Sequence, residues 1–412
     1  METESRSRAT TPGLTRLKRA NLRELLRHIH YGREVSRSQL ADRAGITRSS
    51  VLGLLNQLES RGLIEQVIGS ATGEVGRPST MVRASSTVVA FSVVPLYDSL
   101  VVATVGLSGR IFRRSTIEFD HLPSPAETTE RAALLIEEHR RDLPHDAVIA
   151  GVGVAIPGHA RGEEGIVESA YSLNWHGVPL SQMLADRTGL PVWLDNDASL
   201  ASLAEQRFGI ARDLRNLVLL FGAVGGIGGG LVVEGQLLRG RDGFAGELGH
   251  IAISDVVRPD YGGIPGSLDS VVNRLDLLDA LGLQRADDDT LAQLIRQHPP
   301  GAVDLVLDRQ AEALGKAIGM LMNMLNPEAV VVTGFLRVIF ECRRSTVDAA
   351  VRRFALETHA TNCPVLLGTL GSDVLLVGAA ELAFASLISD PLEAPLVIAA
   401  PGPSATNRSA TA

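Results

Sequence analysis

The stretch LPVWLDNDASLASLAE, residues 190–205, decides the fold of the larger part of this chain. Residues 192–194 form an apolar run typical of a buried strand, and a helix is expected to begin near Ala198. Asn196 and Asp197 lie between the two, at the end of the strand, where side chains of an α/β sheet point into a cleft. The stretch therefore predicts an α/β fold with a polar site at residues 196 and 197, although either residue could simply cap the helix.

Strands and helices alternate in two blocks around this stretch. Apolar runs predict strands in the first block at residues 88–94, 100–105, 111–117 and 147–156, with a helix at 127–141. The second block begins with strands at 217–221 and 231–233, separated by a run of glycines. The pattern predicts two α/β lobes, residues 87–198 and 199–375, with a helix at 376–387 returning to the first. Residues 388–412 are rich in Pro, Ser, Thr and Ala and predict a disordered tail.

The N-terminal 83 residues have a different pattern. A flexible arm, residues 1–13, precedes a helix at 14–31, and Ser36 with Gln39 has the spacing of a capping box that opens a second helix. Gly45 permits a tight turn, after which Thr47 can cap a third helix. Strands at 63–67 and 80–83 flank the loop GSATGEVGRPS, residues 69–79. This is the plan of a winged helix-turn-helix over residues 14–83.

Charge separates the two parts of the chain. Residues 1–83 hold 14 Lys and Arg against 8 Asp and Glu, a net +6, whereas the remainder holds 25 against 39, a net −14. A basic module on an acidic body is expected if only the module approaches DNA phosphates. The predicted base contacts are on the third helix, at Arg48, Ser49, Ser50 and Gly53. Arg77, in the wing, is expected to enter an A·T-rich minor groove. The alternative is a winged helix that binds protein.

Composition excludes several classes of protein. The chain of 412 residues is 45% hydrophobic, enough to build real cores. Its continuous apolar runs, such as residues 217–221 and 329–332, are shorter than the ~20 residues of a membrane helix, and the charged N-terminus is unlike a signal peptide. We therefore expect a cytoplasmic protein without membrane contact. Cys342 and Cys363 are too few for a disulfide framework and are expected to be ordinary thiols.

Five motifs carry a resemblance to a known family. In chain order they are GVGVAIPG (151–158), LNWHGVPL (173–180), LPVWLDNDASLASLAE (190–205), GGIGGGLVVEGQLLRG (225–240) and GELGHIAIS (246–254). Their order and spacing, behind a winged helix-turn-helix, resemble the ROK family of repressors and sugar kinases. The resemblance implies a two-lobed, actin-like sugar-kinase body whose cleft holds a sugar.

The resemblance also implies the sugar-binding residues. Asn196 matches a position that hydrogen-bonds sugar hydroxyls, and Asp197 matches the catalytic base of the kinases. Glu247 and His250, three residues apart and thus on one side of a helical turn, match residues that grip the sugar. The other two candidates are a turn glycine and an acid one methylene shorter than the family's Glu: Gly158 and Asp269.

The chain departs from the kinases where they bind nucleotide. Ser92 replaces an Asp of the first phosphate loop, and Gly225 replaces a Thr of the second. Phe335 replaces a glycine that admits the adenine base. Because phosphoryl transfer depends on positioning and charge stabilisation, we expect no catalytic residue, with Asp197 a vestige of the base, and no kinase activity.

The family's structural zinc is also expected to be absent. Asp260, Gly262 and Ser267 replace all three cysteines of the zinc-binding run, and zinc needs about four ligands. We predict neither metal nor cofactor.

These observations favour a sugar-responsive DNA-binding regulator, more specifically a repressor of carbohydrate-utilisation genes. Its expected partners are double-stranded operator DNA, a monosaccharide or sugar-phosphate effector, and a second copy of the chain in a homodimer or homotetramer. The alternative is an ATP-dependent, glucokinase-like sugar kinase with an appended DNA-binding domain. A third hypothesis, a regulator whose cleft answers to a protein partner, is disfavoured by the joint presence of Asn196, Asp197, Glu247 and His250.

Overall fold

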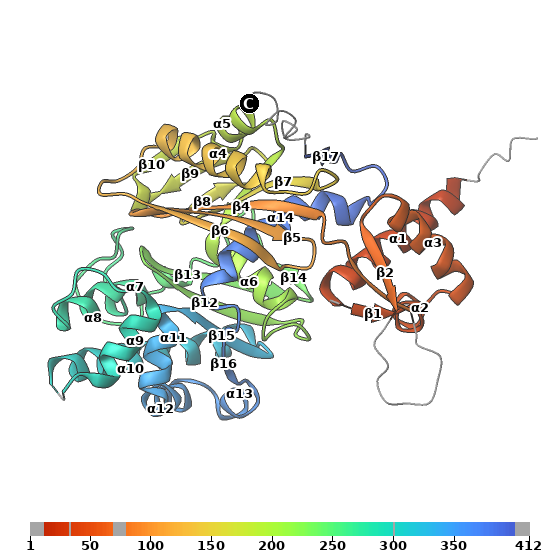
Figure 1. Cartoon of the computed structure of the whole chain (residues 1–412). Coiled ribbons are helices and arrows are strands. Elements are labelled where there is room, and N and C mark those ends of the chain that lie inside the picture. Colours follow the sequence, from red (N-terminus) through yellow and green to blue (C-terminus); the bar gives the residue numbers. More distant parts are fainter. Residues whose placement is uncertain (1–11, 33, 69–79, 300, 400–412) are drawn as a thin grey trace, which may run out of the picture.

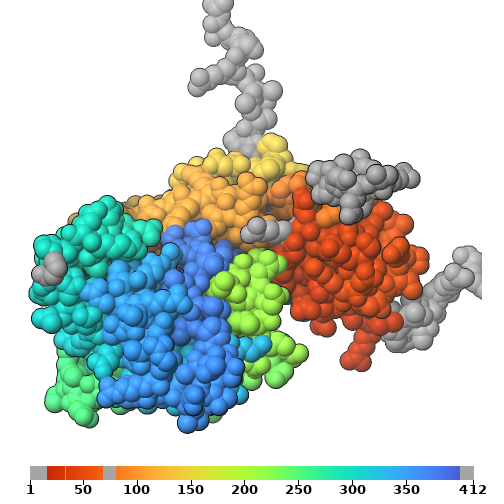
Figure 2. Space-filling model, turned by 90° about the horizontal axis from the view of Figure 1, so that it is seen from below, coloured from red at the N-terminus to blue at the C-terminus, as the bar shows by residue number. Residues whose placement is uncertain are grey.

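A computed structural model describes residues 12–32, 34–68, 80–299 and 301–399. The N-terminal part, here called the HTH domain (residues 12–84), lies to one side of a two-lobed body (Figures 1 and 2). It contains helices α1 (Pro12–Gly32), α2 (Arg37–Ala44) and α3 (Arg48–Ser60), and strands β1 (Glu34–Ser36), β2 (Ile64–Ile68) and β3 (Thr80–Ala84). The strands form an antiparallel sheet in the order β1-β3-β2.

Local signals in the sequence set the ends of the HTH helices. Ser36 and Gln39 form the expected capping box of α2, and Gly45 ends that helix with a φ of +63°. Thr47 caps α3 by accepting a hydrogen bond from the Ser50 amide. The wing loop, residues 69–79, and with it Arg77, lies outside the described residues.

Lobe I is built on a central sheet of order β11-β7-β4-β5-β6 (Figure 1). Its strands are β4 (Val88–Pro95), β5 (Ser99–Gly106), β6 (Ile111–Glu118), β7 (Val148–Ile156) and β11 (Val192–Asn196). A second sheet joins β8 (His159–Arg161), β9 (Ile166–Ala170) and β10 (Trp175–Val178), followed along the chain by helix α5 (Leu180–Thr188). Helix α4 (Pro125–Arg141) packs on the central sheet, and the short helix η1 (Tyr171–Leu173) joins β9 to β10.

Lobe II holds a sheet of order β14-β13-β12-β15-β16. Its strands are β12 (Leu217–Ala223), β13 (Gly226–Val233), β14 (Gln236–Leu237), β15 (Ala329–Gly334) and β16 (Val365–Leu367). Its helices are η2 (Leu248–His250), α7 (Leu268–Val271), α8 (Arg274–Ala280), α9 (Asp288–Gln297), α10 (Ala302–Leu325), α11 (Phe335–Cys342), α12 (Arg344–Phe354), α13 (Glu357–Asn362) and η3 (Gly371–Asp373). Helices α6 (Asp197–Arg207) and α14 (Val374–Ser389) pack against each other between the two sheets.

The glycine run predicted to separate two strands is itself part of strand β13. A Cβ at Gly228 would lie 2.6 Å from the Cβ of Ala198, and one at Gly230 would lie 1.9 Å from the Ser202 hydroxyl oxygen. The glycines therefore let α6 lie directly on this strand.

The C-terminal prediction needs correction. Residues 388–399 are not a disordered tail: α14 continues to Ser389, and β17 (Val397–Ile398) pairs with β7. Ala394 and Ala399 are buried, and the Arg61 guanidinium donates hydrogen bonds to the carbonyls of Pro391 and Ala394. Residues 400–412 lie outside the described part of the chain.

Helix α14 is more apolar than the runs noted in the sequence. Within the described residues, 371–389 is the one helical segment long and apolar enough to span a membrane. Helix α14 packs instead against β4, β7 and α6 as a core helix, and the one charged residue of α14, Glu381, is 2% exposed.

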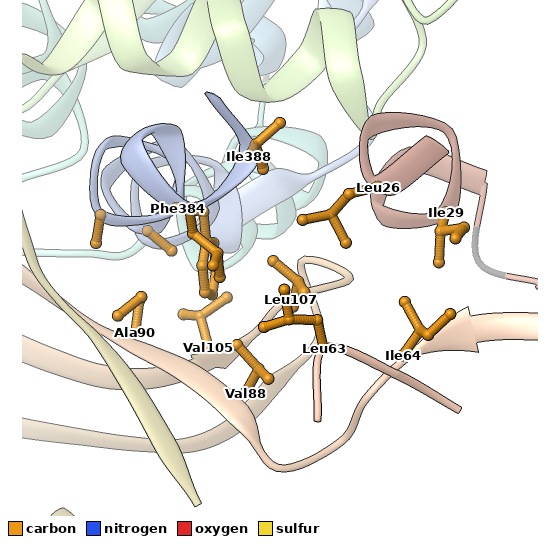
Figure 3. Close-up of a cluster of buried hydrophobic side chains, with 14 of the residues drawn as sticks. Leu26, Ile29, Leu63, Ile64, Val88, Ala90, Val105, Leu107, Phe384 and Ile388 are labelled. Atoms are coloured by element: carbon orange, nitrogen blue, oxygen red, sulfur yellow. The ribbon is translucent and has the colours of Figure 1, made fainter. Parts of the chain in front are cut away.

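The HTH domain and lobe I share one hydrophobic core. Leu26 and Ile29 of α1, Val105 of β5, and Phe384 and Ile388 of α14 belong to a single buried cluster (Figure 3). Because apolar packing of this kind resists sliding, the orientation of the HTH domain is tied to lobe I.

Candidate functional site

A cavity of about 190 Å³ lies between the two lobes, and most of the predicted sugar-binding residues line it. Gly158, Asn196 and Asp197 belong to lobe I and α6, and Glu247 and His250 belong to lobe II. We call this the inter-lobe cavity. Its remaining lining residues are Pro157, His159, Tyr171, Ser172, Ala223, Gly225, Gly226, Ile227, Gly228, Tyr261, Gly262 and Ile264.

Asn196 has a structural role as well as a place in the cavity wall. Its side-chain oxygen accepts a hydrogen bond from the Ser199 amide (2.9 Å) and so caps α6. Its side-chain NH₂ donates to the Gly158 carbonyl (3.0 Å). The two predicted site residues are thus joined to each other and to the start of α6.

Asp197 is buried, with 6% of its surface exposed, and accepts a hydrogen bond from the Ala198 amide (2.7 Å). Burial, together with the nearby charge of Glu247, raises the pKa of this carboxyl to about 7. A carboxyl with such a pKa can exchange a proton with a bound hydroxyl near neutral pH.

Glu247 and His250 converge as their spacing predicts, but each also has a partner that the sequence did not reveal. Glu247 lies 3.1 Å from His159 Nε2, across the cleft, and 3.8 Å from His250 Nε2. The His250 ring bonds Asp260 through Nδ1 (2.7 Å) and the Tyr261 hydroxyl through Nε2 (2.9 Å).

His159 is the main site residue that sequence reasoning missed. Its ring stacks on Phe244, with centroids 4.6 Å apart, and its hydrogen bond to Glu247 raises the pKa of the imidazole. The signal was present, because this histidine directly follows Pro157 and Gly158 of a motif already assigned to the sugar cleft.

Asp269 does not line the inter-lobe cavity itself but lines an adjoining pocket, which shares Ala223, Gly225, Gly226 and Tyr261 with that cavity. Its carboxylate accepts a hydrogen bond from the Ile227 amide (2.9 Å), and burial raises its pKa to about 6. A Cβ at Gly226 would lie 2.9 Å from a carboxylate oxygen of Asp269. The carboxyl thus lies against the backbone of the glycine-rich turn.

A second cavity, of about 590 Å³, adjoins the first and shares Pro157, Ser172, Asp197, Ala223 and Gly225 with it. The three positions at which this chain departs from the kinases, Ser92, Gly225 and Phe335, provide few groups that could bind a nucleotide there. Ser92 is buried and donates to the Leu376 carbonyl (2.6 Å). Phe335 is buried in the core of lobe II. A Cβ at Gly225 would come within 2.9 Å of the Ser172 Cβ, so a threonine there would press on lobe I.

The loop that corresponds to the family's zinc-binding run does not fit zinc. Of its replacement residues, Asp260 bonds His250 and Ser267 caps α7. Over the described ranges, no three His, Cys, Asp or Glu side chains are grouped so as to hold a metal ion. The donor set is therefore too small for a tetrahedral zinc site.

The N-terminal end of α3 presents the predicted DNA-reading face. Arg48, Ser49, Ser50 and Gly53 are all exposed, whereas the opposite face of the helix is buried. The Thr47 hydroxyl lies 3.1 Å from the Ser49 hydroxyl and 2.9 Å from that of Ser50. The hydroxyls are thus held at the helix end that approaches base edges in related domains.

Comparison with known proteins identifies the family. A model of the ROK family matches residues 98–386, and a model of the IclR helix-turn-helix domain matches residues 24–67. The chain therefore belongs to the ROK family. With its N-terminal domain it is a ROK-family regulator that carries an IclR-type helix-turn-helix.

The relatives include both a repressor and a kinase. The xylose repressor of Caldicellulosiruptor bescii is 23% identical, over 92% of this chain and 98% of its own length. The glucokinase of Halalkalibacterium halodurans is 30% identical but covers 56% of this chain and 74% of its own. The crystal structure of a ROK family transcriptional regulator, a homologue of the E. coli MLC protein, has the same fold (TM-score 0.73, 24% identity, 91% of this chain and 98% of that one).

Proposed function

We propose that this chain is a sugar-responsive transcriptional repressor of carbohydrate-utilisation genes, acting without kinase activity as a homodimer or homotetramer on operator DNA. The observation that carries the proposal is a continuous structural connection between the inter-lobe cavity and the HTH domain. Helix α6 begins at Asn196 and Asp197 in the cavity wall and ends at Arg207, which bonds Glu381 (2.6 Å).

Glu381 is the centre of a buried polar cluster, here called the junction (His30, Tyr31, Arg207 and Glu381). His30, at the end of α1, lies with Nε2 2.6 Å from one carboxylate oxygen, and the Tyr31 hydroxyl donates to the other (3.1 Å). The side chains of His30 and Glu381 are 0% and 2% exposed. Burial by itself would raise the pKa of Glu381, but His30 and Arg207 outweigh burial and hold it at about 2. The junction therefore joins α6 and α14 to the DNA-binding domain through the Glu381 carboxylate, whose charge is stabilised by its hydrogen-bond partners.

A ligand in the cavity can act on this connection because the cavity wall comes from both lobes. A sugar held by Asn196 and Asp197 on one side and by Glu247 and His250 on the other favours the closed form by its differential affinity. Closure would then alter the spacing of paired HTH domains, and paired half-sites accept only spacings near one helical turn or its multiples. A coupling of about 1–3 kcal/mol corresponds to about a 5- to 150-fold change in operator affinity.

The test needs a ligand and an operator, which can both be found with the purified chain. A thermal-shift screen of monosaccharides and their phosphates identifies the ligand, since ~100 times the Kd stabilises by about 2.7 kcal/mol. Selection from random duplexes identifies the operator. Calorimetry then measures sugar affinity with and without saturating operator, for the wild type and for His250→Ala.

Linkage fixes the expected result. Operator DNA must weaken sugar binding by the same factor by which sugar weakens operator binding. His250→Ala should lose sugar affinity and keep operator affinity. Equal sugar affinities in both titrations, or an operator response to sugar that survives in His250→Ala, would contradict the proposal.

The alternative is a sugar kinase with an appended DNA-binding domain. It rests on Asp197, whose position between the two cavities and pKa of about 7 suit a general base. Against it stand the burial of Ser92 and Phe335 and the lack of room for a threonine at Gly225, where a Cβ would lie 2.9 Å from the Ser172 Cβ. These residues offer little to position the phosphates and adenine on which phosphoryl transfer depends.

A further inference from the structure

We propose that the effector is an unphosphorylated sugar, and that the carboxylate of Asp269 occupies the place in the glycine-rich turn where a phosphate would otherwise bind. This inference rests on the proposed function and decides a question that function leaves open, since either a sugar or its phosphate ester could act as the signal.

The wall of the inter-lobe cavity is acidic. Asp197 and Glu247 line it, and Asp260 lies directly behind His250. Among the described residues that line this cavity there is no lysine or arginine. Its two histidines already have carboxylate partners, His159 with Glu247 and His250 with Asp260. A dianionic phosphate would therefore meet like charges and find no free cation.

An amide of the glycine-rich turn is already bonded to a carboxylate of the protein. Backbone amides of such turns bind phosphate when they point at an open concavity. Here the Ile227 amide donates to Asp269 (2.9 Å), and both carboxylate oxygens lie about 3 Å from where a Cβ of Gly226 would be (2.9 and 3.0 Å). A phosphate at this turn would have to displace a buried carboxylate and then remain beside it.

The second cavity does not offer an unpaired cation to a phosphate group that reaches beyond the inter-lobe cavity. Each of its arginines is paired with an acid: Arg114 with Asp373 (3.5 Å), Arg274 with Asp288, and Arg337 with Glu341 (2.7 Å). Asp287 and Asp289 add further negative charge to the wall. An ester that extended into this cavity would have to compete with a carboxylate for each arginine.

A neutral sugar is not repelled by these carboxylates and needs no cation. Carboxylates accept hydrogen bonds from hydroxyls, and charge-assisted bonds of this kind are stronger than neutral ones. Asp197 and Glu247 can each accept from a hydroxyl while keeping the contacts that orient them.

Matched pairs of ligands test the inference by calorimetry on the full chain at pH 8. The pairs are glucose and glucose 6-phosphate, N-acetylglucosamine and its 6-phosphate, and mannose and mannose 6-phosphate, with xylose measured alone. We expect the sugar that binds to bind at least ~100-fold more tightly than its phosphate, the effect of like charges a few ångströms apart.

The outcomes separate this inference from the proposed function. A phosphate ester that binds as tightly as its sugar, or more tightly, and releases operator DNA would overturn the inference and leave the function standing. If no sugar or ester binds while the chain still binds its operator, both the inference and the sugar-responsive part of the function fail.

Variants of Asp269 test the role of its carboxylate. Asp269→Ala frees the Ile227 amide, and Asp269→Asn removes the charge while keeping an acceptor for that amide. We expect Asp269→Ala to gain about tenfold in affinity for the phosphate ester relative to the sugar, and Asp269→Asn to gain less. Asp255→Asn, an exposed acid in the same lobe, is the matched control and should change neither. Unchanged ester affinity in both folded Asp269 variants would show that the turn is not what excludes phosphate.

Discussion

Replacing Glu381 by glutamine should loosen the HTH domain from the body without changing the size of the side chain. The carboxylate accepts from three donors, His30 (taken as protonated at Nε2), Tyr31 and Arg207. A glutamine amide offers one oxygen and one NH₂ group, so its NH₂ would face a donor. The variant therefore breaks the junction and leaves Arg207 without its buried counter-charge.

The depressed pKa of Glu381 sets the size of the effect. A shift from 4.5 to about 2 corresponds to about 3 kcal/mol of interaction with the ionised form. The side chain is 2% exposed, so solvent screening removes little of this. Loss of one partner of a buried pair typically costs about 3–5 kcal/mol, which agrees in order of magnitude. For a unit of about 200 residues, such a loss lowers the melting temperature by roughly 5–10 °C.

The sign of the pH dependence gives a second measure. Because the folded pKa lies below the unfolded value, the stabilisation is present above about pH 4.5 and is lost as the pH falls towards 2. The difference in stability between wild type and Glu381→Gln should therefore be full at pH 7 and shrink below pH 4.5.

The assay combines calorimetric melting with hydrogen exchange at α1 and the sugar-dependent change in operator affinity. We expect Glu381→Gln to melt earlier, to exchange faster at the end of α1, and to lose most of its response to sugar. Glu393→Gln is the matched control, since Glu393 pairs with Arg19 across the same boundary but is 66% exposed. Exposed pairs contribute about 0–1 kcal/mol, so this variant should behave as wild type. If both variants keep the melting temperature and sugar response of the wild type, the junction does not couple the domains.

Three further predictions concern the two sites. Asp197→Asn should stabilise the sugar-free chain, because the raised pKa of Asp197, about 7, means that the wild type loses native stability as the pH rises from about 4 to 7. In denaturant titrations, the stability gained by the variant should grow over this range and level off above pH 7, at up to about 4 kcal/mol. A stability difference that does not depend on pH would count against the assignment. In gel-shift titrations, Ser49→Ala or Ser50→Ala should change base preference, and Arg48→Ala should weaken operator binding by about 1–3 kcal/mol. Arg77→Ala should weaken binding chiefly at A·T-flanked sites. A footprint that none of these substitutions changes would contradict the DNA assignment. A coupled assay with ATP and common hexoses should remain at background, and turnover of even ~1 per second would support the kinase alternative.

Local signals predicted much of the fold because the physics that they report is local. The capping box of Ser36 and Gln39 and the cap at Thr47 act within one helical turn, and the structure confirms both. Glu247 and His250 converge because their spacing is that of a single turn.

The features that sequence reasoning missed depend on contacts between distant residues. His30 and Glu381 are 351 positions apart, and neither has a local pattern that identifies its partner. The glycines of β13 favour a turn by propensity, and only the close approach of α6 explains a strand there. Residues 397 and 398 pair with β7 although their surroundings have the composition of a disordered tail. Asp269 accepts a hydrogen bond from the Ile227 amide, 42 positions away, and no local pattern identifies that partner.

Helix α6 connects the inter-lobe cavity to the junction. Its first turn is fixed to the cavity by Asn196, and its last residue, Arg207, is fixed to the junction. Along its side, Ala198 and Ser202 contact glycines of β13 so closely that no side chain fits between them. Under the proposed function, we expect closure of lobe II on a sugar to move α6 with it, because close-packed contacts of this kind do not slide freely. We expect this movement to displace Arg207, and the hydrogen bonds of Glu381 to Arg207, His30 and Tyr31 would pass the displacement on to α1.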